Sequence, residues 1–218
     1  VKQVPIENAT VVFQGVEGAY SYAAMRQYFG RNIESYHVKT WRTAMEDVTD
    51  GKADYAVLPI ENSTAGIVAD IYDLLMEYKL YIVGEQIIRV DHVLLGTQDA
   101  SMEDIRKVCS HPQGLAQCKA FLEEHPTWKK KEVENTAGAA KSVSEGGDKT
   151  VAAIASREAG EVFGLKILAE NVCREKANST RFIIVGRKPE YEEKAGKISI
   201  CFELPHETGT LYNMLSHI

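Results

Sequence analysis

The sequence predicts an α/β protein made of two doubly wound lobes, each built around a mainly parallel sheet. Strand-like runs rich in β-branched and aromatic residues alternate with helical patterns along most of the chain. Alternation of this kind is typical of β-α-β units, whose strands are parallel. The alternation breaks at 80–96 and 165–186, where strand-like text leaves no room for a helix. Two such connections are what two lobes joined by two crossing strands need.

The individual elements follow from the local patterns. The segment 66–78 is the clearest helix, because its apolar residues recur at helical spacing, and 113–125 is another. Thr40 and Ser101 are typical helix N-caps, and Gly51 is a typical C-terminal stop. The expected strands are 11–14, 36–39, 55–60, 106–110, 150–156 and 181–186.

Domain boundaries follow from the two breaks. A first lobe is expected over 9–83 and 173–187, with a second lobe, 84–172, inserted between its two parts. Residues 1–8 and the charged segment 188–196 have the composition of linkers. The last residues, 197–218, are expected to form a strand and the start of a helix, which cannot bury a core alone. This tail and the non-methionine start, Val1, suggest a fragment of a longer protein.

The composition excludes several classes of protein. The 218 residues are 44% hydrophobic and 26% charged, with a net charge of −6. This composition disfavours a disordered chain, and the negative charge disfavours nucleic acid and anionic membranes as partners. The sequence has neither a signal-peptide pattern nor an apolar run long enough to span a bilayer. The cysteines show no metal-site or disulfide pattern, so free thiols in a reducing cytoplasm are expected; these are Cys109, Cys118, Cys173 and Cys201.

Polar clusters follow several expected strands, at the edge where open α/β sheets bind ligands. The loop 15–21 is either a tight turn or a backbone cradle for a carboxylate. The cluster 61–64 is equally compatible with helix capping and with a binding site. Around Ser110, capping is a sufficient explanation, and the same holds for Ser156. The cluster 178–181 precedes its strand, so it reaches the same edge only if that strand runs antiparallel to its neighbours.

Taken in order, PIENSTAG (59–66), SHPQGLAQC (110–118) and NSTRF (178–182) resemble the motifs of prephenate dehydratase, and the similarity extends from about Val11 to Gly186. The stretches between them resemble the dehydratase part of bifunctional chorismate mutase–prephenate dehydratases. The resemblance implies a two-lobed catalytic domain like the periplasmic binding proteins of the second type, with a cleft between the lobes. It also implies a following α+β ACT regulatory domain that binds phenylalanine, of which 197–218 would be the first strand and helix. Its ligand-binding element is matched by Gly209, Thr210 and Leu211.

The reaction implied by the resemblance is the decarboxylative dehydration of prephenate to phenylpyruvate, in L-phenylalanine biosynthesis, without a cofactor. Thr180 matches the family's essential hydroxyl, and Glu61 is the only carboxyl of the motifs and the expected proton source. Arg181 is either a clamp for a substrate carboxylate or a strut for its loop. The remaining residues expected to bind substrate are Asn62, Ser63, Ser110, Gln117, Gly18 and Ser21.

The chain departs from the family in its first motif, where Val16 and Ala19 replace a proline and a hydroxyl residue. A side-chain contact from Ala19 to substrate is therefore impossible, although backbone donors remain. Arogenate fits the same motifs as prephenate, and a non-catalytic solute-binding pair of lobes is the alternative of another class. The resemblance further implies a homo-oligomer, dimer or tetramer, and L-phenylalanine as effector of the full-length protein.

Overall fold

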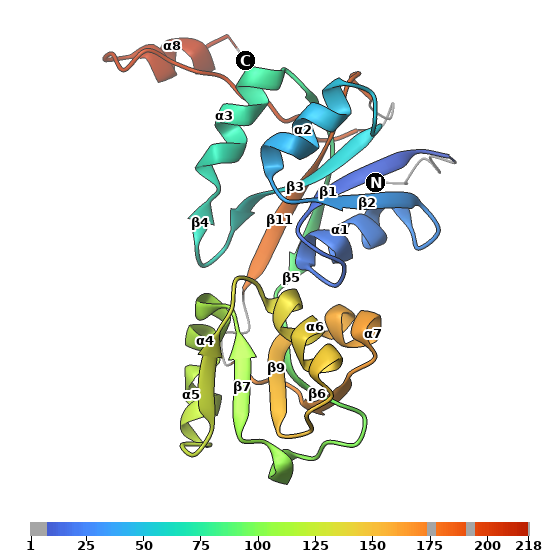
Figure 1. Cartoon of the computed structure of the whole chain (residues 1–218). Coiled ribbons are helices and arrows are strands. Elements are labelled where there is room, and N and C mark those ends of the chain that lie inside the picture. The colour runs from blue at the N-terminus through green and yellow to red at the C-terminus, as the bar shows by residue number, and fades with distance from the viewer. Residues whose placement is uncertain (1–7, 174–177, 191–194, 218) are drawn as a thin grey trace.

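The computed structural model describes residues 8–173, 178–190 and 195–217 of the chain. Two lobes lie one above the other in Figure 1, and the long strands β5 (Tyr81–Arg89) and β11 (Ser179–Gly186) lead toward the second lobe. These two strands pair antiparallel along their whole length, from Ser179 opposite Arg89 to Gly186 opposite Tyr81. Beyond β5 the Val90 N–H donates to the Asn178 carbonyl (2.9 Å), so the chain leaves and re-enters lobe 1 at neighbouring points. The two crossing strands expected from the sequence are therefore present.

Lobe 1 is built on a sheet with the order β2-β1-β3-β11-β5, which has six strands among the described residues when β4 (Gly66–Ile67), beside β3, is included. β1 (Thr10–Gln14) runs parallel to β2 (Glu34–Val38) and to β3 (Tyr55–Asn62). β11 runs antiparallel to β3, with Thr180 opposite Asn62. This direction confirms the condition set by the sequence, because the start of β11 now lies beside the end of β3.

Helices cover both faces of the lobe 1 sheet. Met45 of α2 (Trp41–Thr49) and Ile71 of α3 (Ala69–Tyr78) belong to one core cluster. Met25 of α1 (Tyr20–Phe29) packs with Ile184 in another. Strands covered in this way are apolar on both sides, which explains their continuous hydrophobic runs.

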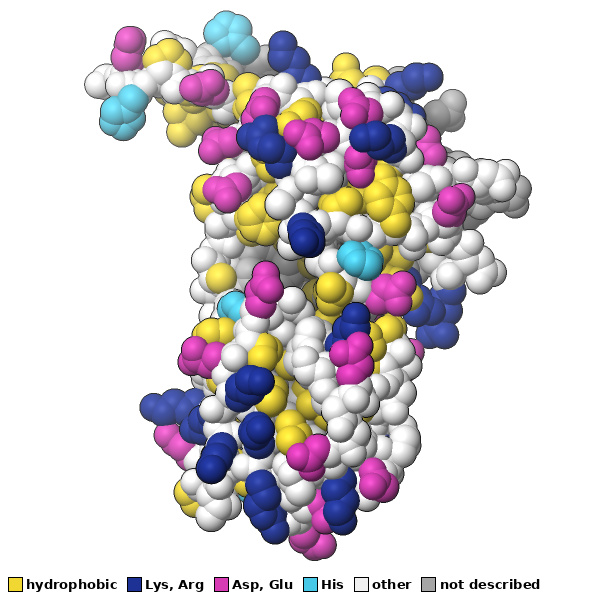
Figure 2. Space-filling view, viewed as in Figure 1, with side chains coloured by type: hydrophobic (Ala, Val, Ile, Leu, Met, Phe, Trp, Pro, Cys, Tyr) yellow, Lys and Arg dark blue, Asp and Glu magenta, His cyan; other side chains and the backbone are white. Residues whose placement is uncertain are grey.

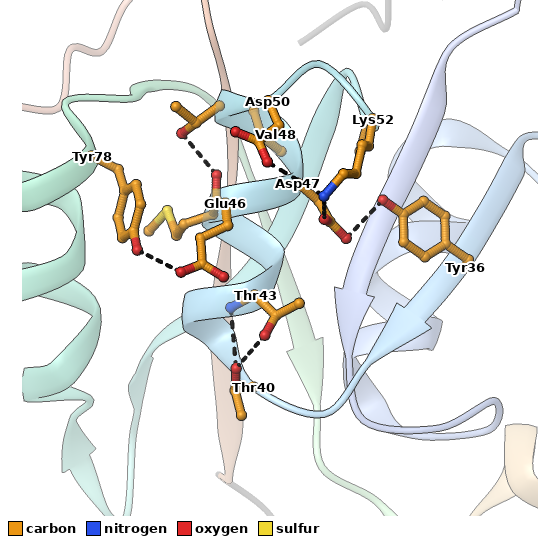
Figure 3. A network of polar contacts seen from close by, with 12 residues as sticks. Tyr36, Thr40, Thr43, Glu46, Asp47, Val48, Asp50, Lys52 and Tyr78 are labelled. Atoms are coloured by element: carbon orange, nitrogen blue, oxygen red, sulfur yellow. Dashed lines mark hydrogen bonds and ion pairs between the residues drawn. The ribbon is translucent and has the colours of Figure 1, made fainter.

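Polar contacts tie α2 to its neighbours (Figure 3). Thr40 caps the helix by accepting from the Thr43 N–H, as expected from the sequence. The carboxylate of Asp47 accepts from the Tyr36 hydroxyl at 3.0 Å and from the Lys52 ammonium at 3.2 Å. Burial, and then the bond to Asp47, raise the pKa of Tyr36 to about 12. Asp47 therefore fixes α2 against the strand β2 and keeps its buried charge paired.

Lobe 2 has a second sheet of five strands among the described residues, in the order β10-β6-β9-β7-β8. β7 runs parallel to β8 and β9, while β6 is antiparallel to β9 and β10. Separate core clusters cover its two faces, one with α6 and α7 and one with α4 and α5. The elements are β6 (His92–Gly96), the 3₁₀ helix η1 (Met102–Asp104), β7 (Lys107–Ser110), α4 (Pro112–Gln117), α5 (Lys119–Glu123), β8 (Lys129–Glu132), α6 (Thr136–Gly146), β9 (Val151–Ser156), α7 (Arg157–Phe163) and β10 (Lys166–Ala169).

The structure corrects two helix expectations. The helix expected over 66–78 begins only at Ala69, because Gly66 has a φ of +86° and pairs in β4 instead. The helix expected over 113–125 is interrupted at Cys118, between α4 and α5. Cys118 is disulfide-bonded to Cys173, so the expectation of four free thiols is also wrong; Cys109 and Cys201 are free.

The tail differs from its expectation as well. The described residues from 195 to 209 contain no strand, and α8 (Thr210–Leu215) follows as a short helix. A strand needs a neighbour for its backbone hydrogen bonds, and the α8 end of the tail stands away from lobe 1 in Figures 1 and 2. The first part of the tail touches lobe 1 through side chains, with Lys197 Nζ 2.6 Å from a Glu85 carboxylate oxygen and Cys201 against the lobe 1 core. Several large apolar side chains of the tail are exposed, with Ile198 at 76% and Tyr212 at 77%. The expected first strand of an ACT domain is therefore absent from the described part of the tail.

Candidate active site

A cavity of about 280 Å³ takes its walls from both lobes. Lobe 1 contributes Asn62 at the end of β3 and Thr180 at the start of β11, which is the edge where the sequence placed its polar clusters. Lobe 2 contributes the beginnings of β6, α4 and α6. The lining residues are Tyr20, Asn62, Val90, His92, His111, Gln113, Gly114, Gln117, Glu134, Asn135, Thr136, Asn178 and Thr180.

Asn62 and Thr180 form one hydrogen-bonded unit in the lobe 1 wall. The Asn62 Oδ1 accepts from the backbone N–H groups of Thr64 (3.0 Å) and Ala65 (2.8 Å), which fixes the amide with its nitrogen toward β11. The Asn62 Nδ2 then donates to Thr180 Oγ1 at 2.9 Å and to Asn178 Oδ1 at 2.8 Å. Because the Thr180 oxygen accepts from Asn62, its own proton is free to be donated elsewhere.

A second hydrogen-bonded unit crosses from one lobe to the other. The Tyr20 hydroxyl, at the start of α1, lies 2.8 Å from His92 Nδ1 at the start of β6. The other ring nitrogen, His92 Nε2, lies 3.2 Å from Gln117 Oε1 at the end of α4. Burial lowers the pKa of His92 against the opposing effects of Gln117 and Asp91, so the imidazole is kept neutral.

Glu61 and Arg181 are not among the residues that line the cavity. They sit opposite each other on β3 and β11, where Arg181 Nη2 lies 3.5 Å from Glu61 Oε2. Arg181 Nη1 is also 3.8 Å from a carboxylate oxygen of Glu85 on β5. Side chains alternate between the two faces of a strand, so this ion pair lies on the face opposite to Asn62 and Thr180. The geometry therefore favours a structural role for Arg181, which holds its loop in place, over a clamp for a substrate carboxylate. The Glu61 carboxylate does not face the cavity.

The other sequence candidates support the cavity without lining it. Ser110 is fully buried and donates to the Ile154 carbonyl at 2.7 Å, which ties β7 to β9. Ser63 accepts from the Ser179 N–H at 2.9 Å and so holds the two strand ends together. Ser21 donates to the Gln14 carbonyl at 2.6 Å.

Gly18 lies in the contact between the lobes rather than beside the cavity. Its carbonyl accepts from Ser156 Oγ of lobe 2 at 2.8 Å, and a Cβ on it would stand 2.9 Å from Ala159 Cα. Val16 and Ala19 pack against the lobe 2 core cluster. The two departures from the family's first motif are therefore apolar contacts of this interface.

Several lining residues were not singled out from the sequence. His111 and Asn135 cap α4 and α6, with His111 Nδ1 accepting from the Gln113 N–H and Asn135 Oδ1 from the Gly138 N–H. Both nevertheless line the cavity, as does Glu134. His92 lies between the quoted motifs, and Tyr20 lies in the loop 15–21 of the first motif. Their signal is a polar residue at the first position of a strand or helix on the ligand-binding edge.

Within the described ranges, the structure contains no group of three or more histidine, cysteine or acidic side chains that could hold a metal ion. The helices found there are all too short or too polar to cross a membrane.

Comparison with known proteins agrees with the motifs. The sequence model of the family described as prephenate dehydratase matches residues 11–190. The chain belongs to this family. The prephenate dehydratase motifs thus lie on the wall of one cavity, with the exceptions described above, and the resemblance seen in the sequence is confirmed.

Two curated relatives show how much of a longer protein is covered. The bifunctional chorismate mutase/prephenate dehydratase of Escherichia coli (strain K12) is 38% identical over 83% of this chain and 48% of its own length. The chloroplastic arogenate dehydratase/prephenate dehydratase 2 of Arabidopsis thaliana is 39% identical over 94% of this chain and 54% of its own. The chain spans about half the length of the curated relatives it matches.

Solved structures share the two-lobed architecture. A prephenate dehydratase from Arthrobacter aurescens in complex with L-Phe is 28% identical, with a TM-score of 0.81 over 95% of this chain and 70% of that one. GqqA, described as a novel type of quorum quenching acylase, is 41% identical, with a TM-score of 0.76 over 84% of this chain and 65% of that one. The fold class expected from the sequence, two α/β lobes around a cleft, is confirmed. The expectation of mainly parallel sheets is wrong, because β11 in lobe 1 and β6 in lobe 2 pair antiparallel with both of their neighbours, so each sheet is mixed.

Proposed function

We propose that this chain is the catalytic part of a prephenate dehydratase, which converts prephenate into phenylpyruvate. The observation that carries the proposal is the Asn62–Thr180 unit, which presents a free hydroxyl proton to the cavity between the lobes. Membership of the family adds the reaction class. The active site would consist of Thr180, Asn62 and Gln117, with Asn178 and His111 completing the wall.

The reaction breaks two bonds of the substrate. The bond from the ring carbon to its carboxylate breaks, carbon dioxide leaves, and the electron pair enters the ring. The carbon–oxygen bond on the opposite side of the ring breaks, and the hydroxyl leaves with its electron pair, takes up a proton and becomes water. The ring thereby becomes aromatic. The protein has to stabilise the negative charge that develops on the leaving oxygen.

Thr180 suits that role because its oxygen is occupied by the Asn62 amide and its proton is not. The hydroxyl can therefore donate to the leaving oxygen as charge develops there. Asn62 is a positioning residue here, because its oxygen and its nitrogen are both engaged by the protein. We assign no proton transfer to Glu61, which is paired with Arg181 outside the cavity.

The charge of the cavity also supports decarboxylation. Among the described residues that line it, neither lysine nor arginine is found, and Glu134 adds a carboxylate; the side-chain donors are amides, hydroxyls and imidazoles. Neutral donors can orient a carboxylate, but they stabilise it less than a cation does. A weakly stabilised carboxylate departs more readily as carbon dioxide.

The test compares variants at Thr180. The purified chain is incubated with prephenate, and phenylpyruvate is followed by its absorbance. Thr180→Val keeps the β-branched shape and removes the hydroxyl, so kcat should fall by about 100- to 1000-fold, as for the loss of one transition-state donor. Thr180→Ser should retain most of the rate, and Thr49→Val on α2, far from the cavity, should retain all of it. An unchanged kcat in Thr180→Val would remove this hydroxyl from the mechanism.

Two other activities and one non-catalytic alternative are tested beside it. Arogenate is the alternative substrate, since the Arabidopsis relative is named for both substrates. GqqA motivates an assay of acylase activity on acylated quorum-sensing signals. An acylase needs a nucleophile next to a base. The Thr180 hydroxyl instead accepts a hydrogen bond from the Asn62 amide, which is not a base, so this arrangement does not favour an acylase. Binding without any product would favour the solute-binding alternative.

Further properties are proposed for the longer protein. We infer that L-phenylalanine regulates it, because the Arthrobacter enzyme was solved in complex with L-Phe. Gly209, Thr210 and Leu211 are the residues assigned to that site. Titration of the full-length protein with L-phenylalanine tests this role. Sedimentation and cell fractionation test the proposed homo-oligomer and cytoplasmic location.

A further inference from the structure

His92 is buried, with 3% of its surface exposed, yet it belongs to the cavity wall and has a partner on each ring nitrogen. The partner at Nδ1 is the Tyr20 hydroxyl at 2.8 Å, and the partner at Nε2 is Gln117 Oε1 at 3.2 Å. Tyr20 and Gln117 also line the cavity. The three side chains, here the Tyr20–His92–Gln117 chain, join lobe 1 to the helix that carries Gln117.

The chemistry of the partners fixes the direction of both hydrogen bonds. An amide oxygen only accepts, so Nε2 of His92 carries the proton and donates to Gln117. In a neutral imidazole the other nitrogen is then an acceptor, and it takes the proton of the Tyr20 hydroxyl. The ionisation states agree with this pattern. Burial lowers the pKa of His92, and burial, followed by the charges of Glu158 and Asp91, raises the pKa of Tyr20.

The direction of these bonds decides what Gln117 offers to a ligand. Its oxygen is held by His92, and within the described part of the chain its amide nitrogen has no hydrogen-bond partner. Gln117 therefore presents an N–H donor to the cavity instead of a carbonyl acceptor. A donor suits a substrate that carries carboxylates, and an amide rotated by half a turn would repel one.

We propose that His92 is a positioning residue that turns the Gln117 amide nitrogen toward a carboxylate of the substrate, with Tyr20 of the other lobe setting its tautomer. The carboxylate belongs to the proposed function, on which this inference rests. His92 is not assigned a catalytic role, since both of its nitrogens are engaged by the protein.

The loop before Tyr20 connects this orientation to the seating of the lobes. Ser156 of lobe 2 donates to the Gly18 carbonyl at 2.8 Å, and Val16 and Ala19 pack against the lobe 2 core. The loop is thus anchored two residues before Tyr20. A shift of lobe 1 would withdraw the phenol, and Nδ1 would lose the donor that selects the tautomer. The binding mode of Gln117 in one lobe is therefore set by contact with the other.

The first test reads the tautomer without any substrate. Nitrogen-15 NMR of the histidine side chains in the intact chain, with His92 assigned from the signal missing in His92→Gln, should show Nε2 protonated and Nδ1 unprotonated. Tyr20→Phe, which removes only the hydroxyl, should shift the Nδ1 signal. Protonation at Nδ1, or an Nδ1 signal unaffected by Tyr20→Phe, would overturn the proposal. This result does not depend on whether the chain turns over prephenate.

The second test uses steady-state kinetics with prephenate. His92→Leu and Gln117→Ala should each raise KM by about 2- to 10-fold, the value of one neutral hydrogen bond, with a smaller effect on kcat. The double variant should be no worse than Gln117→Ala, because both changes remove one interaction. His92→Gln places an amide donor near the position of Nε2 and should restore most of the KM. A positioning role would be contradicted if the rise in KM of the double variant equalled the product of the two single rises, or if only kcat fell.

A folding control keeps the kinetic test decisive. The thermal unfolding midpoint of each variant is measured alongside KM. If His92→Leu does not fold, Tyr20→Phe and His92→Gln carry the test, since both keep a polar side chain or ring of similar size. Tyr20→Phe should then raise KM by about 2- to 10-fold as well. An unchanged KM in a folded Tyr20→Phe would show that the phenol has no part in orienting Gln117.

Discussion

Substituting Gly18 by alanine tests the contact that holds the two lobes together. Gly18 has a φ of +81°, which a residue with a Cβ rarely adopts, and the added Cβ would stand 2.9 Å from Ala159 Cα and 3.2 Å from its Cβ. These are atoms of the helix α7 and cannot swing aside as the end of a long side chain can. Gly18→Ala therefore strains the backbone and pushes the lobes apart.

The magnitude has two parts. A positive φ costs a residue with a Cβ about 1–2 kcal/mol. Overpacking at a tight contact costs about 1–3 kcal/mol more. The expected loss in the free energy of unfolding is therefore about 2–5 kcal/mol, and each kcal/mol lowers Tm by about 2–4 °C in a chain of this size. If the lobes separate to relieve the clash, the Tyr20–His92 bond breaks and KM for prephenate rises.

Gly147→Ala is the matched control. Gly147 also has a positive φ, +60°, but no atom lies within 4 Å of its added Cβ, so only the backbone cost applies. Both variants are compared with the parent chain by thermal unfolding and by KM. A loss of stability equal to that of Gly147→Ala, together with an unchanged KM, would refute the interpretation that Gly18 sets the distance between the lobes.

Three further perturbations test other features. Reduction of the Cys118–Cys173 disulfide should lower the free energy of unfolding by about 4 kcal/mol on the loop-entropy relation, because the bond closes a loop of 55 residues; Cys118→Ser should lose the same amount and be insensitive to reductant. Arg181→Ala should lower stability by about 0–1 kcal/mol, as for a partly exposed ion pair, and leave KM within about twofold; a tenfold rise in KM would instead make Arg181 a substrate clamp. Burial lowers the pKa of His92 in the folded chain, although Asp91 opposes the shift. As the pH falls through the ordinary pKa of 6.5, the histidine of the unfolded chain therefore takes up a proton before that of the folded chain does. Stability should therefore be full above that pH and fall as the pH drops below it, and urea titrations of His92→Gln should lack this part of the fall.

Local patterns were sufficient for most of the fold. The strands β1, β3, β7 and β9 are continuous apolar runs because both of their faces are buried. Such runs can be recognised in the sequence without knowing which strands lie beside them. The departures arise from constraints that a single segment does not contain. Cys118 lies inside a helical pattern, and its bond to a cysteine 55 residues away accompanies the break between α4 and α5. Gly66 is not helical because it pairs with Asn62 of β3 instead.

The sequence could predict site residues only where their position depends on a single strand. The strand expected to end at Ile60 continues to Asn62, so Glu61 and Asn62 alternate between two faces. Adjacent motif residues therefore do different things, and only Asn62 reaches the cavity. The Tyr20–His92 bond joins residues 72 positions apart, on different lobes. No local pattern contains such a pair, since it depends on how the lobes dock.

The place of β11 in its sheet has a consequence for biosynthesis. β11 lies at the centre of the lobe 1 sheet, between β3 and β5, yet it is the last strand of that sheet to leave the ribosome. All of lobe 2 is synthesised before it. Lobe 2 can therefore begin to fold while the sheet of lobe 1 is still incomplete, and β3 waits with an unpaired edge. Closing that sheet pairs Tyr55 with Gly186, a long-range contact of the kind that slows folding. During this interval the free edge of β3, and β5, whose neighbour among the described strands is β11, are open to pairing with other chains.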